Sequence, residues 1–290
     1  MEKIIICLSI NESASSVLDY GLQFAENFNL RVEVILIRRL VDGDNIDILL
    51  EGIPPFMPGE KAPIRISDDH DEEIIKQLRD MISSDTECTV MDFSSELIEI
   101  LEEKYKQREF STLLLPHSPK LEKWPFMDSL NKFVETLNCP VLLIDPSTKF
   151  KKPEHVVYAS NYLHGDINVI KRFRKISANK VKDIDIIHIS YGDTFKEKIL
   201  EKGFQAYLEE NITDLNIKVH QVSAVKSQST TIEVFLDEVA KISPDMLILM
   251  KEEKSFLEVL FSKSFTIATA KKCSIPLLIL HQRYSKINND

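Results

Sequence analysis

The sequence predicts an α/β fold made of two tandem doubly wound domains with flavodoxin-like or Rossmann-like topology. Each domain is expected to hold a five-stranded parallel sheet flanked by helices. The chain begins twice, since a strand-like apolar run at 4–8 has a counterpart at 156–159. It also closes twice, because 138–144 and 274–280 each place a proline before an apolar run. A repeat this long indicates two copies of a domain, which we assign to 1–147 and 153–283.

The first half alternates strand and helix patterns. Continuous apolar runs predict buried strands, and apolar residues three or four positions apart, such as Leu18, Leu22 and Ala25, predict helices. A connection at 40–66 holds three glycines and four prolines, and a loop of this length often marks a lid, a docking segment or disorder. The expected strands are 4–8, 32–37, 88–93, 112–115 and 141–144, and the expected helices are 13–28, 74–82, 97–105 and 121–137.

A linker at 145–154 leads to a second half with the same order of elements. The pattern Thr230-x-x-Glu233 is a capping box that predicts a helix start. The expected strands are 156–160, 184–189, 217–223, 246–250 and 277–281, and the expected helices are 166–178, 194–211, 231–242 and 256–272. In such sheets ligands bind outside the carboxyl ends of the strands, where the strand order reverses. We therefore expect a site after the first and fourth strands of each half.

Charge and composition exclude several classes of protein. The net charge is −10, with 15 basic against 28 acidic residues in 1–150, and this acidity argues against nucleic-acid binding. The balance of +3 in 151–290 favours one half packing on the other. No apolar run reaches the ~18 residues of a membrane span, and no secretion signal is evident. Four scattered cysteines without a Cys-x-x-Cys pair predict reduced thiols in a cytoplasmic protein.

The order of these elements resembles the tandem form of the universal stress protein family. The resemblance covers nearly the whole chain and rests on the opening strand, the fourth strand with its loop and helix, and the closure Cys139-Pro140-Val141-Leu142-Leu143-Ile144. It implies a nucleotide site, because many members bind ATP through a loop after the fourth strand. That loop reads Gly-x-x-Gly, nine residues, then Gly-Ser or Gly-Thr, and an acidic residue ends the first strand.

Neither half keeps the glycines that this loop needs. Phosphate approaches backbone N–H groups closely only where no Cβ intervenes, yet the chain has no glycine between 60 and 164 or after 203. In the second half the pattern falls on Met250, Glu253, Lys263 and Ser264, of which only Ser264 fits. In the first half Pro116 and Pro119 remove two donors. The positions of the acid are Ser9 and Asn161, both neutral, so conventional ATP binding is not expected.

The sequence thus predicts a non-catalytic stress protein that binds an unknown protein partner or a small ligand, without a metal or cofactor. No nucleophile elbow and no metal-ligand spacing of histidines is present, and His188 is expected in the core. The alternative is an ATP- or AMP-binding, weakly hydrolysing switch with an altered site at Asn161, Lys251, Lys263 and Ser264. The halves are also expected to pair within one chain through 141–144 and 277–280, and two chains could form a homodimer.

Overall fold

The structure is a computed structural model with a sheet at its centre. It describes residues 2–38, 69–92, 95–117, 137, 139–162, 165–192, 195–223, 228–251, 269 and 272–281. The connection at 40–66 lies outside these residues, as do the expected helices at 121–137 and 256–272 apart from residues 137, 269 and 272.

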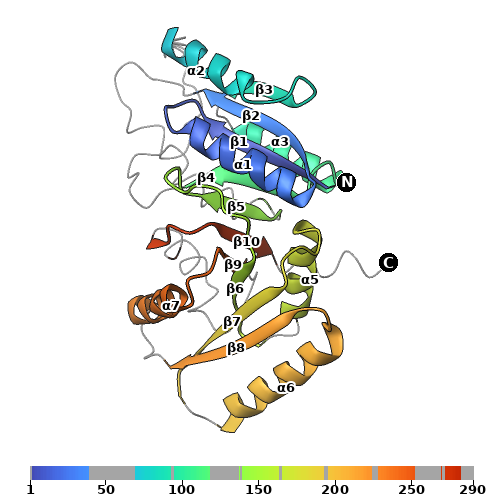
Figure 1. Ribbon diagram of the computed structural model, residues 1–290, viewed down its shortest axis with the longest axis vertical. Coiled ribbons are helices and arrows are strands. Elements are labelled where there is room, and N and C mark those ends of the chain that lie inside the picture. The colour runs from blue at the N-terminus through green and yellow to red at the C-terminus, as the bar shows by residue number, and fades with distance from the viewer. Residues whose placement is uncertain are drawn as a thin grey trace, which may run out of the picture.

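Ten strands form one sheet, and their buried apolar residues explain why each run of sequence became a strand. The order across the sheet is β3-β2-β1-β4-β5-β10-β9-β6-β7-β8 (Figure 1). The strands are β1 (Lys3–Ser9), β2 (Arg31–Arg38), β3 (Glu87–Asp92), β4 (Thr112–Pro116), β5 (Val141–Ile144), β6 (His155–Ala159), β7 (Asp183–Ser190), β8 (Asn216–Ser223), β9 (Met246–Lys251) and β10 (Leu277–His281). All ten expected strands are present at or close to their expected positions.

The sheet is parallel except at one seam. β10 runs antiparallel to β5, and Leu277, Leu278 and Ile279 lie opposite Leu143, Leu142 and Val141. The strands of the two halves therefore belong to one ten-stranded sheet, and the expected pairing of 141–144 with 277–280 is what joins them. The physical reason is that pairing satisfies backbone groups that β5 and β10 would otherwise leave bare at an edge. The buried apolar side chains of both halves also form one connected core.

Helices cover both faces of the sheet (Figure 1). Gly21 lets α1 (Ala14–Phe28) approach the sheet closely, since a Cβ there would lie 2.6 Å from Ile6 Cδ1 and 3.1 Å from Leu114 Cδ1. Side chains alternate between the two faces of a sheet along each strand. Ile6 faces α1, so Ile5 and its neighbour Glu33 on β2 point to the opposite face. On that face α3 (Ser95–Lys106) supplies Lys104, which binds Glu33. The helices are α1 (Ala14–Phe28), α2 (Asp69–Asp80), α3 (Ser95–Lys106), α5 (Asp166–Ile176), α6 (Phe195–Asn211) and α7 (Gln228–Ile242).

The start of α7 differs from its expected position. The helix begins at Gln228, so Thr230 lies inside its first turn instead of capping it. The apolar stripe that identified this helix is nevertheless buried at Ile232, Phe235 and Val239. Packing of that stripe fixes the helix, whereas a capping motif is a local signal that permits a start at a neighbouring residue.

Basic residues of α5 and the turn after it contact the first half of the chain. Arg172 donates to the Ser111 carbonyl oxygen at 3.4 Å, Lys175 pairs with Glu2 at 2.7 Å, and Lys180 donates to the Asn27 carbonyl oxygen. Of the three contacts, the ion pair of Lys175 with Glu2 joins a basic residue of the second half to an acidic residue of the first, as the charge difference between the halves predicts. All four cysteines are free. Among the described residues, no helix has the length and apolar character needed to cross a bilayer.

Candidate functional site

The candidate site of the second half lies where β6 and β7 end. Its described residues follow β6 directly, come from the carboxyl half of β7, or open α5. Because β5 and β10 are antiparallel, the carboxyl ends of the first five strands lie at the opposite edge of the sheet from this site. The chain therefore has two candidate edges that face away from each other.

A buried carboxylate organises the end of β6. Asp166, in the first turn of α5, is fully buried and accepts hydrogen bonds from the Tyr158 hydroxyl at 2.8 Å and from Ser160 Oγ. Ser160 Oγ in turn accepts the backbone N–H of Tyr162 at 2.9 Å. An acid in this position is favoured by the positive end of the helix dipole. It also places a negative charge beside backbone N–H groups that could otherwise receive an anion.

The next residue to fix the site is Tyr162, whose backbone has a left-handed φ of 57°. Its ring stacks on His188 at a centroid distance of 3.9 Å and packs against Phe204 of α6. A left-handed conformation is uncommon for a bulky residue and needs surrounding packing to hold it. The two rings supply that packing, so the chain leaves β6 in one defined direction.

His188 is a core residue, as the sequence predicted. It is buried, and a ring nitrogen lies 2.9 Å from the Ser160 carbonyl oxygen. Burial lowers the pKa of His188 because it disfavours the charged ring, while the Ser160 carbonyl and the charges of Glu197 and Glu201 oppose that effect without overcoming it. The ring is accordingly neutral at neutral pH and donates to the carbonyl.

The predicted site residues are only partly placed. Asn161 is 6% exposed, and its Nδ2 has no hydrogen-bond partner among the described residues. Lys251 ends β9, the strand that pairs with β6, so its backbone lies at the same edge as Asn161. Lys263 and Ser264 lie outside the described residues. A buried amide donor without a partner carries a desolvation cost that an acceptor atom of a ligand would remove.

At the corresponding edge of the first half, several polar groups bond to one another. Asn11 Oδ1 accepts both the backbone N–H and the hydroxyl of Ser13, at 2.9 and 2.7 Å, where the chain turns into α1. Ser9 ends β1 and is buried. His117 follows β4, and its backbone N–H donates to the Ile144 carbonyl oxygen at 2.8 Å. Among the described residues, no group of three or more His, Cys, Asp or Glu side chains could hold a metal ion.

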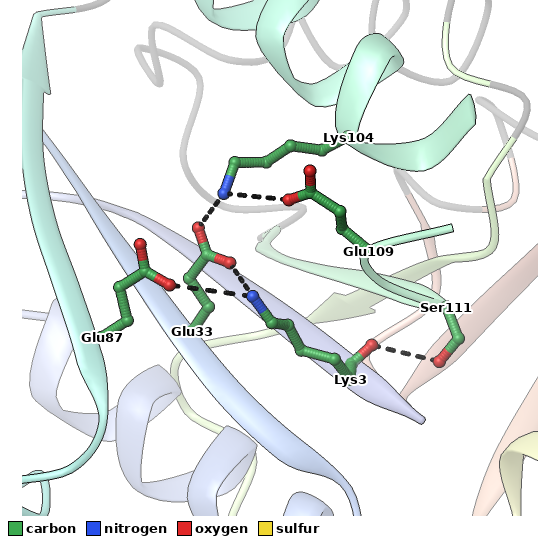
Figure 2. A network of polar contacts seen from close by, with 6 residues as sticks. All are labelled: Lys3, Glu33, Glu87, Lys104, Glu109 and Ser111. Carbon is green, nitrogen blue, oxygen red and sulfur yellow. Dashed lines mark hydrogen bonds and ion pairs between the residues drawn. The ribbon is translucent and has the colours of Figure 1, made fainter. Parts of the chain in front are cut away.

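A second kind of polar feature lies away from these edges, in the form of a buried carboxylate between two basic side chains. Figure 2 shows Glu33 of β2 between Lys3 of β1 and Lys104 of α3. The Glu33 side chain is 2% exposed, and Lys104 Nζ lies 2.7 Å from its Oε1. Burial alone would raise the pKa of Glu33, but hydrogen bonds from Lys104 and Lys3 and the charges of both lower it.

The second half has a carboxylate of the same kind at Asp185 of β7. His155 Nε2 binds one oxygen of this carboxylate, and His220 Nε2 lies 2.5 Å from the other. Burial opposes ionisation of Asp185, but the hydrogen bonds and charges of His220 and His155 outweigh it and lower its pKa. Neither cluster was predicted from the sequence. A single acid inside an apolar strand, as at 32–37 and 184–189, was the available signal.

Comparison with known proteins identifies the fold. No protein-family model and no curated protein matches the sequence. Solved structures are similar over nearly their whole length. A universal stress protein from Archaeoglobus fulgidus DSM 4304 shares 13% identity and a TM-score of 0.60, over 96% of this chain and 98% of that one. A putative universal stress protein from Pseudomonas aeruginosa UCBPP-PA14 has 11% sequence identity and a TM-score of 0.58, over 97% of this chain and 93% of that one. A functionally unknown protein from Pseudomonas aeruginosa PAO1 has 12% sequence identity and a TM-score of 0.56, over 96% of this chain and 92% of that one. The chain therefore has the fold of universal stress proteins.

Proposed function

We propose that the chain is a cytosolic, non-catalytic universal stress protein of the tandem type, which acts by binding a protein partner or a small ligand. The observation that carries this proposal is a stress-protein fold whose phosphate loops have no glycine in either half. Phosphate binding by such a loop depends on glycine. A framework kept without that loop is expected to serve recognition and not nucleotide turnover.

Equivalent contacts in the two halves support the tandem arrangement. Ser111 donates its backbone N–H to the Lys3 carbonyl oxygen at 2.8 Å, and Asp245 does the same to His155 at 2.9 Å. Arg172 of α5 reaches Ser111 across the seam. We infer that the halves, 1–147 and 153–283, are two copies of one domain that pair as an intramolecular pseudo-dimer through β5 and β10.

Equilibrium dialysis with ATP tests this function. We expect no stoichiometric binding at micromolar ATP, with or without magnesium. Stoichiometric micromolar binding that a Ser264→Ala substitution abolishes would overturn the proposal. Mass spectrometry of the protein as purified, denatured to release any bound compound, gives a second readout that requires no choice of ligand.

One observation favours the alternative, a nucleotide-binding switch with an altered site in the second half. Asn161 Nδ2 is a buried donor without a described partner, at the edge where Lys251 ends β9. In this alternative, Asn161 with Lys251, Lys263 and Ser264 would bind the nucleotide. Asn161→Ala should then weaken ATP or AMP binding at least tenfold. Ser9→Ala, the matching substitution in the first half, should leave it unchanged.

A further inference from the structure

We propose that the outward face of α6, which carries Phe195, Ile199 and Ala206, binds a second copy of this chain. The two α6 helices would pack antiparallel about a two-fold axis. The sequence left a homodimer open, and this inference gives it an interface at the outer end of the sheet, away from the seam (Figure 1). It goes beyond the proposed function and does not depend on it.

The outward face of α6 holds large apolar side chains that one chain leaves in water. Phe195, Ile199 and Leu200 are 80%, 53% and 42% exposed. Phe195 and Ile199 are four positions apart and so share one face of the helix. The opposite face holds α6 on the molecule through Phe204 and Leu208, which are both buried. Clustered exposed apolar side chains, unlike single ones, mark interaction sites.

The equivalent helix of the first half shows that the fold does not require this apolar face. α2 and α6 each lie between the second and third strands of their half. The inward residues Ile74, Ile75 and Leu78 of α2 are buried. Every residue that the structure describes as exposed within α2 is polar, namely His70, Glu72, Glu73, Lys76, Gln77, Arg79 and Asp80. The apolar outward face is therefore a feature of α6 itself.

The exposed charges of α6 are complementary to a helix of the same sequence that runs in the opposite direction. Lys198 and Lys202 are exposed in its first half, whereas Glu209 and Glu210 are exposed in its last turn. The helix dipole favours the reverse order, with acids first and cations last, so this order does not stabilise α6 alone. In an antiparallel pair, the lysines of each helix meet the carboxylates of the other, and two-fold symmetry forms this contact twice.

The middle of the face lets a second helix approach closely. Ala206 is exposed, and no atom lies within 4 Å of a Cβ built at Gly203. If the two-fold axis passes just before Gly203, Ile199 lies opposite the partner's Ala206, a large side chain against a small one. Lys198 then lies within one helical turn of the partner's Glu209. Apolar and charged contacts are thus satisfied in a single register.

A lipid bilayer fits the same face less well. Helices with apolar and lysine side chains also bind anionic membranes. However, Glu209 and Glu210 are exposed on this helix and the net charge of the chain is −10, so an anionic surface would repel it. A second chain instead brings lysines to these carboxylates. One pair of helices buries less than about 1,200 Å², so we expect a weak dimer with a dissociation constant of about 10–100 μM.

Sedimentation velocity of the full chain from about 1 to about 300 μM tests the proposal. The dimer fraction should rise with concentration, and Phe195→Ser and Ile199→Ser should each weaken association at least about tenfold. Met81→Ser is the control, because Met81 is the fourth exposed large apolar residue of the described chain and lies after α2 in the first half. It should leave the dissociation constant unchanged.

Two charge reversals identify the partner as the same face of a second chain. Lys198→Glu and Glu209→Lys, both at exposed positions, each place like charges at both contacts of a homodimer, so each variant alone should be monomeric. An equal mixture of the two should form a heterodimer, because opposite charges then meet at both contacts.

Three results overturn the proposal. They are a wild-type chain that stays monomeric up to about 300 μM, an equal loss of association in Met81→Ser, and a mixture of the charge variants that does not associate. Cosedimentation of a monomeric wild-type chain with vesicles of equal parts phosphatidylserine and phosphatidylcholine would assign the face to a membrane and overturn it as well.

Discussion

Removing the charge of Glu33 should destabilise the protein far more than removing that of its neighbour Glu87. Glu33 is almost completely buried and is bound by two ammonium groups, whereas Glu87 is 60% exposed and lies 3.8 Å from Lys3 (Figure 2). Charged hydrogen bonds contribute about 1.5–3 kcal/mol each, and an amide retains part of that. We expect Glu33→Gln to lower the free energy of unfolding by about 2 kcal/mol at neutral pH.

The control substitution is Glu87→Gln in the same cluster. Exposed ion pairs contribute about 0–1 kcal/mol, so this variant should lose less than about 0.5 kcal/mol. Urea unfolding at low and moderate salt measures both variants. Equal losses from Glu33→Gln and Glu87→Gln would refute the argument that burial sets the strength of these contacts.

The effect of Glu33→Gln should also depend on pH in one direction. The pKa of Glu33 is lower in the folded protein than its ordinary value of 4.5. Its contribution is therefore complete above pH 4.5 and is lost as the pH falls through the folded pKa. The difference between wild type and variant should be the same at about pH 7 and pH 5.5, and smaller at about pH 3.5. A difference that does not shrink at the acid end would contradict the assignment.

Four further substitutions have defined outcomes. Gly21→Val should lower the free energy of unfolding by about 2 kcal/mol, because the new side chain would collide with Ile6. Gly203→Ala should raise it by up to about 1 kcal/mol, because no atom lies within 4 Å of the added Cβ. Thermal unfolding measures both changes. Leu278→Ala in the seam should cost about 2–5 kcal/mol in urea unfolding, and a loss below 1 would show that the seam is not tightly packed. His188→Gln should reduce the loss of stability that the wild type shows as the pH falls below about 6.5. The reason is that the unfolded chain can then protonate this histidine, whereas burial lowers its pKa in the folded protein.

The strands were predictable because each one is set by its own run of apolar residues. The pairing of 141–144 with 277–280 was also expected, because both are closing strands with an edge to cover, whereas the charge clusters were not predicted. An apolar run such as 141–144 identifies a strand by itself, and its side chains are buried in the structure. That β5 and β10 join two sheets into one depends on residues far apart in sequence. Likewise, His155 and His220 lie 30 and 35 positions from Asp185, too far apart for a local pattern, and only the register of three strands brings the three residues together. Asn161 and Lys251 could be assigned to one edge of the sheet, because both follow or end neighbouring parallel strands. Which other side chains complete a site at that edge depends on tertiary packing, which the sequence does not show directly.

The antiparallel seam also has a consequence for folding during synthesis. All strands of the first half precede residue 145, so its parallel pairs can form before the second half is made. One edge of β5 is then bare until β10, at 277–281, has been synthesised. An apolar edge strand without a mate is a template for pairing with another chain. A chain that stops before β10 should therefore aggregate through β5. The last strand of the second half thus also protects the first half, because it covers the exposed edge of β5.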